Sequence, residues 1–174
     1  ATLGSINDAT TDATTADVIG SSVTLTAGSG IGNTNVIELA DGAVVDLSVN
    51  VAGNLAATGL GVLTVSSADT TAGNITLDAT TLSISGPLAS GGGLVLSGSS
   101  VLNVNAAVNS AGGVLLQNTG TANIGANISA GTSLSGLNDS SVALNNASLT
   151  TTAGSIDLSS GVGSISVAGA VVTM

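Results

Sequence analysis

The feature that most limits the fold of this chain is a recurrence of small dipeptides about every 20 residues. The dipeptides are Ala52-Gly53, Ala72-Gly73, Gly91-Gly92, Ala111-Gly112, Ala130-Gly131 and Ala153-Gly154. The successive spacings are 20, 19, 20, 19 and 23 residues. A period of this length is typical of a solenoid, in which each repeat packs mainly against its two neighbours.

Each repeat carries two pairs of apolar residues, and the members of a pair are two positions apart. The first pairs are Leu55/Ala57, Ile75/Leu77, Leu94/Leu96, Val114/Leu116 and Ile156/Leu158. The second pairs are Leu63/Val65, Leu82/Ile84, Leu102/Val104, Ala122/Ile124, Val142/Leu144 and Ile165/Val167. A single apolar residue follows at Leu88, Val108, Ile128, Leu149 and Val171, and the segment from Thr34 fits with Ile37/Leu39 and Val45/Leu47. A spacing of two is the period of a β-strand that turns one face inward.

The pattern predicts an all-β fold, a right-handed parallel β-helix (β-solenoid) over residues 20–174 with coils of about 19–23 residues. A left-handed hexapeptide solenoid would place apolar residues every six positions, and the observed offsets of about two, six and four do not. Residues 1–19 are expected to be an irregular segment that serves as an inter-subunit strand or a cap. Within them the polar stretch Asn7–Asp17 is interpreted as a loop, cap or linker.

The composition removes most enzymatic chemistry. The chain has no Lys, Arg, His, Cys, Phe, Trp or Tyr, and its ten acidic residues give a formal charge of −10. Without those side chains there is no Ser-His-Asp triad, thiolate, Schiff base or P-loop lysine, so we expect a protein that is not an enzyme. Nucleic acid and membrane insertion are not expected either, because basic residues and an apolar run of 18 are lacking.

Carboxylates are the remaining candidates for chemistry. A glycosidase needs only two of them, and Asp41 and Asp46 are the nearest pair on one coil. For metal binding, Asp8 and Asp12, or Asp41 and Asp46, are the candidate loop ligands of Ca²⁺; no other cofactor is expected. In the predicted register no acidic residue lies directly above another on the next coil, so the alternative is that the charges serve solubility.

Three stretches resemble the repeats of filamentous-haemagglutinin-type bacterial adhesins. They are Ser22-Val23-Thr24-Leu25-Thr26-Ala27-Gly28, Ala72-Gly73-Asn74-Ile75-Thr76-Leu77 and Ala153-Gly154-Ser155-Ile156-Asp157-Leu158. The resemblance implies a right-handed β-helical shaft, an extracellular or cell-surface location, and a role in adhesion or matrix formation. Its implied partner is a host or neighbouring-cell surface.

Self-association is the second expected role, since unpaired strand edges at the ends of a solenoid template further pairing. The candidate residues for end-to-end stacking of copies are Leu3, Ile6, Ile165, Val167, Val171 and Val172. The uncharged stretch Ala79–Asn138 is a candidate contact between neighbouring rods, and Asn103 and Asn123 share an offset that predicts an Asn ladder. The rival functions are a glycan-binding or ice-binding face, with the carboxylate glycosidase as a third.

Overall fold

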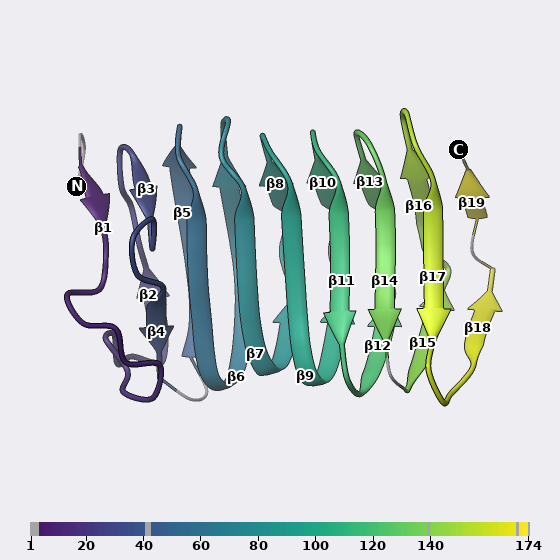
Figure 1. Ribbon diagram of the computed structural model, residues 1–174, viewed down its shortest axis with the longest axis horizontal. Coiled ribbons are helices and arrows are strands. Elements are labelled where there is room, and N and C mark those ends of the chain that lie inside the picture. The colour runs from purple at the N-terminus through teal and green to yellow at the C-terminus, as the bar shows by residue number, and fades with distance from the viewer. Residues whose placement is uncertain (1–3, 41–42, 139, 170, 174) are drawn as a thin grey trace.

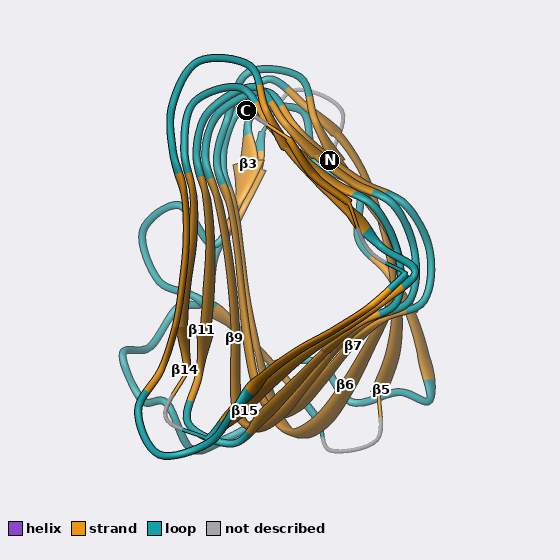
Figure 2. Ribbon diagram, turned by 90° about the vertical axis from the view of Figure 1, so that its right-hand side faces the viewer, coloured by secondary structure: helices purple, strands orange, loops and turns teal. Residues whose placement is uncertain are grey.

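The chain winds into a three-sided coil whose strands stack in parallel from the N-terminal to the C-terminal end (Figure 1). This architecture is seen in a computed structural model that describes residues 4–40, 43–138, 140–169 and 171–173. Seen from the C-terminal end, the chain runs down β14 (Leu134–Asn138), across the base along β15 (Ser141–Asn145) and up β16 (Ser148–Thr151) while advancing toward the viewer (Figure 2). That path is counterclockwise, so the solenoid is right-handed as predicted.

The strands of each coil lie on three faces. The first face contains β1 (Ser5–Ile6), β3 (Gly30–Ile31), β4 (Ile37–Leu39), β11 (Val114–Asn118), β14 (Leu134–Asn138) and β17 (Ile156–Ser160). The second contains β2 (Ser22–Thr24), β12 (Thr121–Ile124), β15 (Ser141–Asn145) and β18 (Ile165–Ala168). The third contains β8 (Leu88–Ser90), β10 (Val108–Ser110), β13 (Ile128–Ala130), β16 (Ser148–Thr151) and β19 (Val171–Thr173). Longer strands turn a corner and contribute to more than one face: β5 (Ala43–Val51), β6 (Leu55–Thr70), β7 (Ile75–Ile84) and β9 (Leu94–Val104).

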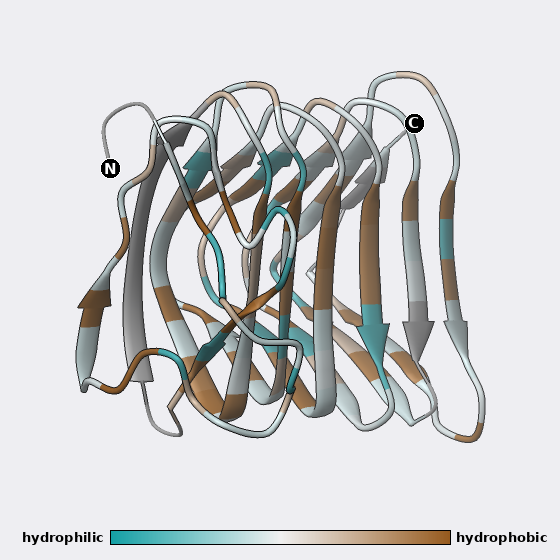
Figure 3. Cartoon of the chain, turned by 60° about the vertical axis from the view of Figure 1, so that its left-hand side comes forward, coloured by the Kyte–Doolittle hydropathy of each residue, from teal (hydrophilic) through white to brown (hydrophobic). Residues whose placement is uncertain are grey.

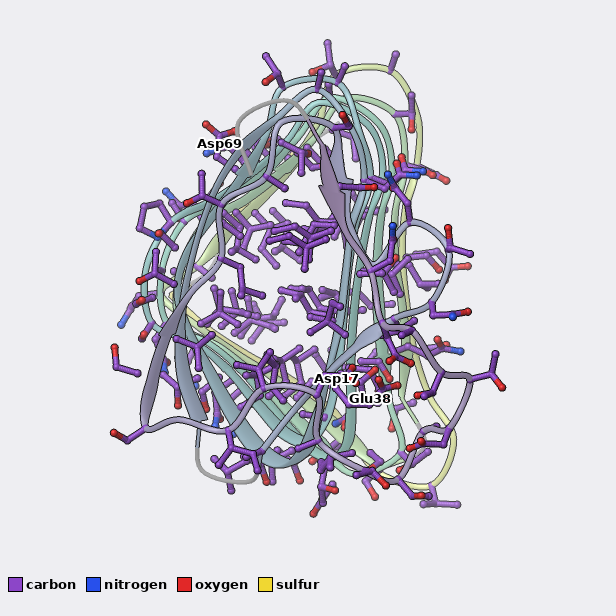
Figure 4. All side chains as sticks on the ribbon, turned by 90° about the vertical axis from the view of Figure 1, so that its left-hand side faces the viewer. Asp17, Glu38 and Asp69 are labelled. Carbon is purple, nitrogen blue, oxygen red and sulfur yellow. The ribbon has the colours of Figure 1, made fainter. Side chains whose placement is uncertain are left out.

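The apolar pairs found in the sequence form columns inside the solenoid. Leu77 pairs with Leu96 and Leu96 with Leu116, and all three are almost fully buried. The other regular columns are Leu55–Ile75–Leu94–Val114–Leu134–Ile156, Leu63–Leu82–Leu102–Ala122–Val142–Ile165 and Val65–Ile84–Val104–Ile124–Leu144–Val167. Apolar side chains fill the interior in layers, and apolar and polar residues alternate along the strands (Figures 3 and 4).

One corner of the interior is polar. Thr70, Ser90 and Ser110 follow one another in the stack, and Thr151 continues the column after Ala130. These four side chains are buried, and each hydroxyl donates to the carbonyl three residues later, for example Ser90 Oγ to Gly93 O at 2.9 Å. A buried hydroxyl needs such a partner, and here the partner is the backbone of the corner itself.

Two details of the predicted register are wrong. In the second coil, Ile31 and not Ile37 is opposite Leu55; Ile37 is opposite Ala57, because residues 32–36 leave the stack as a loop between them. In the last coil, Leu149 is opposite Val172 and Val171 is opposite Ser148. Both shifts arise where a coil differs in length from its neighbours.

The polar segment at the N-terminus is a loop that leaves the first face of the stack. Ile6 pairs with Ile31 and Val18 bridges to Leu39, so residues 7–17 protrude from the first coil where residues 32–36 protrude from the second. The first strand of the described residues, β1, pairs with β3 of the same chain and is followed by this loop. We refer to residues 7–17 and 32–36 together as the double loop.

Candidate functional site

Hydrogen bonds hold the two parts of the double loop together. The Thr34 amide donates to Asn7 Oδ1 at 3.0 Å, and Asn35 Nδ2 donates to the carbonyls of Asp8 and Thr10 at 3.3 and 2.6 Å. At the turn between residues 31 and 37, Gly32 has a φ of +68°, and a Cβ there would lie 2.2 Å from the Ala56 carbonyl oxygen. Glycine is thus required for both the backbone conformation and the close approach of the next coil.

Three carboxylates meet beneath the double loop. Asp8, Asp17 and Glu38 each offer an oxygen, and these oxygens all lie within 4.8 Å of one another. Glu38 is the central residue of β4 and points outward between two inward-facing apolar neighbours, yet it is only 5% exposed. The reason is that residues 7–17 cover this position. Asp17 and Glu38 lie side by side in Figure 4.

The backbone fixes the contact between Asp17 and Glu38. Asp17 Oδ2 accepts the Glu38 amide at 2.9 Å, and the Glu38 carbonyl accepts the amides of Asp17 and Val18 at 2.8 and 3.1 Å. The expectation that no acidic residue lies directly above another on the next coil is therefore wrong. The point at which the loop rejoins the stack sets this contact, and the repeat pattern does not determine that point.

Of the four residues predicted as metal ligands from the sequence, the structure places only one, Asp8, in the acidic cluster. Asp8 belongs to the cluster, whereas Asp12 caps its own turn by accepting the Thr15 amide at 3.0 Å and contacts Thr10 Oγ1 at 3.2 Å. Asp41 lies outside the described residues. Asp46 belongs to β5, where its backbone is opposite Thr24 and Ser67; its side chain is outside the described part.

Sequence reasoning missed Asp17 and Glu38. A usable signal was present: Asp17 is the last residue of the polar stretch before Val18, and Glu38 is an acid between two apolar residues, Ile37 and Leu39. An acid at an outward strand position is ordinary by itself. Glu38 becomes a buried carboxylate only because the loop of residues 7–17 covers it.

The environment raises the pKa of Glu38 from 4.5 to about 7. Burial is the largest cause, followed by the hydrogen bond with Asp17 and by the negative charges of Asp17 and Asp8. The pKa of Asp8 is lowered, chiefly by the Thr10 amide, and that of Asp12 is lowered, chiefly by the Thr15 amide. With no Lys, Arg or His in the sequence, no side chain of the protein can balance the charge of the cluster.

We expect the stability of the metal-free protein to fall as the pH rises from about 4.5 to about 7. In this window the folded state holds a proton on Glu38 that the unfolded chain releases, so raising the pH favours unfolding. At about 1.4 kcal/mol per pH unit, the displacement from 4.5 to about 7 corresponds to roughly 3 kcal/mol at most. Thermal unfolding in a chelating buffer between pH 4.5 and 8 measures it.

Glu38→Gln is the matched variant for this titration, because it keeps the shape and removes the ionisable group. Its stability should be nearly independent of pH in the same window. The pKa values of Asp8 and Asp12 are lowered from 3.8, so these two residues reduce the stability of the folded state only when the pH falls to about 3.8 and below. They therefore do not mask the titration of Glu38 at higher pH. An unchanged pH slope in Glu38→Gln would contradict the assignment to Glu38.

At the C-terminal end, inward-facing side chains are uncovered. Ile165 and Val167 continue two interior columns but are 42% and 57% exposed, whereas Leu144, one coil earlier, is 1% exposed. In the part of the chain that the structure describes, β17, β18 and β19 each pair with a strand on one edge only. Of the other residues expected at the ends, Ile6 is half-buried in β1, Val171 and Val172 lie in β19, and Leu3 is outside the described residues.

The uncharged middle of the rod carries a shallow groove on the first face. Its volume is about 450 Å³, and its lining includes Thr76, Val95, Leu115, Ser133 and Ser135. On the second face the predicted Asn ladder is confirmed. Asn123 Nδ2 donates to Asn103 Oδ1 at 2.9 Å, and Asn103 Nδ2 donates to Ser83 Oγ at 3.3 Å.

In the described part of the chain, Thr76 and Thr150 do not belong to a regular outward array of threonines such as ice binding requires. Thr76 has Ala56 and Val95 as its neighbours on the adjacent coils, and Thr150 has Ser129 and Thr173.

These features define a right-handed parallel β-solenoid rod with an uncovered coil at one end and, near the other, an acidic cluster in which Glu38 is buried. Comparison with known proteins adds no relative, because no family model, no curated protein and no solved structure matches the chain. Among the described residues, no helix is long and apolar enough to cross a membrane.

Proposed function

We propose that this chain is a structural module of an extracellular rod, a β-solenoid subunit or shaft of a surface filament that mediates adhesion or matrix formation. The observation that carries the proposal is the uncovered last coil, whose inward-facing Ile165 and Val167 are exposed although they continue buried columns. A further coil in the same register would bury them. If a second copy supplied that coil, the two copies would form one continuous rod.

The regular core supports a mechanical role. From β6 onward most inward columns repeat from coil to coil, so each coil adds the same parallel backbone pairing and a similar apolar contact. The exception is Gly136, which lies between Leu116 and Leu158 in one column. The stretches that resemble filamentous-haemagglutinin-type adhesin repeats belong to these strands and to β2. The resemblance supports a more specific role, that of an adhesin shaft that contacts a host or neighbouring-cell surface.

A glycan-binding surface is the second candidate, and the groove over Val95 and Leu115 is the place for it. It receives less support, because the chain has no aromatic ring to stack on a sugar. A glycan array with the purified chain, and hydrolysis assays for the glycosidase, separate these activities from a purely structural role.

We expect the purified chain to assemble end to end at high concentration and at an ionic strength of 0.1 M or more, where charges beyond about 10 Å are screened. Val167→Asp should raise the concentration needed for assembly at least tenfold, because a stacked coil would bury the new charge. Sedimentation velocity and negative-stain microscopy measure the assembly.

Ser166→Asp is the control, since it adds the same charge to the same strand at the neighbouring, outward-facing position. It should assemble like the parent chain. A parent chain that stays monomeric at every concentration, or equal assembly by Val167→Asp, would overturn the stacking of copies.

A further inference from the structure

We propose that Asp8, Asp17 and Glu38 form a binding site for a hard divalent cation, Ca²⁺ in the first place, which fastens the double loop to the first face of the solenoid. The cluster joins the start of the loop, its end and the strand beneath it. A cation shared by these three residues would connect all three segments.

The separation of the carboxylates fits one ion. Oxygens that coordinate Ca²⁺ at about 2.3–2.6 Å can lie at most about 5 Å apart across the ion. The oxygens of Asp8, Asp17 and Glu38 all lie within 4.8 Å of one another, so a single Ca²⁺ can reach all three. All the ligands are oxygens, which is the preference of a hard cation and not of one that seeks sulfur or imidazole.

An independent observation indicates that a ligand is needed here. Glu38 is 5% exposed, and its Oε2 atom is fully buried without a hydrogen-bond partner. A buried carboxylate oxygen without a partner is costly, and the adjacent groups are two more carboxylates. Since the sequence contains no Lys, Arg or His, only a proton or a cation from solution can neutralise the cluster.

The site has room and access for the water that would complete the coordination. A hollow of about 260 Å³ opens beside the cluster and is lined by Asp8, Asp12, Thr34, Asn35 and Glu38 among others. A site whose carboxylates come from an irregular loop and a strand favours Ca²⁺ over Mg²⁺, because Ca²⁺ tolerates irregular geometry and Mg²⁺ demands a near-ideal octahedron.

Calorimetric titration of the chelator-treated full chain with CaCl₂ at pH 7.5 tests the site. We expect one site with a dissociation constant on the order of 10⁻⁴ M, weaker binding of MgCl₂, and at least a tenfold loss of affinity in Glu38→Gln and in Asp8→Asn. Asp78→Asn is the matched control. Asp78 lies two coils further along the outward column of Glu38 and Thr58, so its removal changes the net charge equally and should leave the affinity unchanged.

Hydrogen exchange gives a readout that does not depend on the heat of binding. Ca²⁺ should slow exchange at least tenfold at the amides that join the loop to β4, namely Asp17, Val18 and Ala40, and should have no effect on them in Glu38→Gln. The absence of saturable Ca²⁺ binding would overturn the proposal, and a proton on Glu38 would then be what neutralises the cluster. Equal losses in Glu38→Gln and Asp78→Asn would overturn it as nonspecific charge attraction, and Mg²⁺ binding as tight as Ca²⁺ binding would overturn the choice of ion.

Discussion

Leu96→Asp should lower the free energy of unfolding by about 4 kcal/mol or more and the melting temperature by roughly 10 °C. Leu96 is fully buried in the column between Leu77 and Leu116, so an aspartate there would place a charge among aliphatic side chains. No basic residue exists anywhere in the chain to pair with it. Thermal and denaturant unfolding measure the loss.

Val95→Asp is the control, because it introduces the same side chain one residue earlier on the outward face of β9. Val95 is half-buried on the rim of the shallow groove, and its replacement should cost less than about 1 kcal/mol. If Leu96→Asp melted like the parent protein, the interior register of this face would be incorrect.

Gly120→Ala should destabilise the protein by about 3 kcal/mol, which is the upper part of the range for overpacking. A Cβ at Gly120 would lie 1.7 Å from the carbonyl oxygen of Ser100 on the preceding coil. This contact is with backbone, which cannot move aside without breaking the parallel pairing between coils. The cause is steric, since Gly32 and Gly169 are the described glycines with positive φ and Gly120 is not among them.

Gly125→Ala in the same coil is the comparison. Its nearest neighbour would be Asn105 Oδ1 at 3.6 Å, an ordinary van der Waals distance. The substitution should be neutral or add up to about 1 kcal/mol by restricting the unfolded chain. Equal melting temperatures for the two variants would show that the corners of adjacent coils are not in close contact.

The middle of the rod could be predicted in detail because its information is repeated. Strand alternation predicts whether each side chain points into the solenoid or out of it. The recurrence of the same offsets in successive coils then aligns Leu77 with Leu96 and Leu116. The Asn ladder was predictable for the same reason, since Asn103 and Asn123 occupy one outward column. Right-handedness followed from the offsets that excluded the hexapeptide alternative.

The first two coils could not be aligned in this way, because insertions break the period and leave no repeat to compare. Residues 32–36 separate Ile31 from Ile37, which moved the true partner of Leu55 by six residues along the chain. The polar composition of residues 7–17 indicated a loop, and it did not indicate the strand that the loop covers.

The sequence by itself determined the class of fold, the coil length, the inward columns and the absence of any basic side chain. Only the tertiary structure decided that Asp17 rejoins the stack beside Glu38, and that Asp8 lies over both of them. The physical reason is that strand alternation decides which residues point inward, and the recurrence of the same offsets in successive coils decides which of them stack. The meeting of three acids follows from one loop closure, which depends on where that loop rejoins the solenoid.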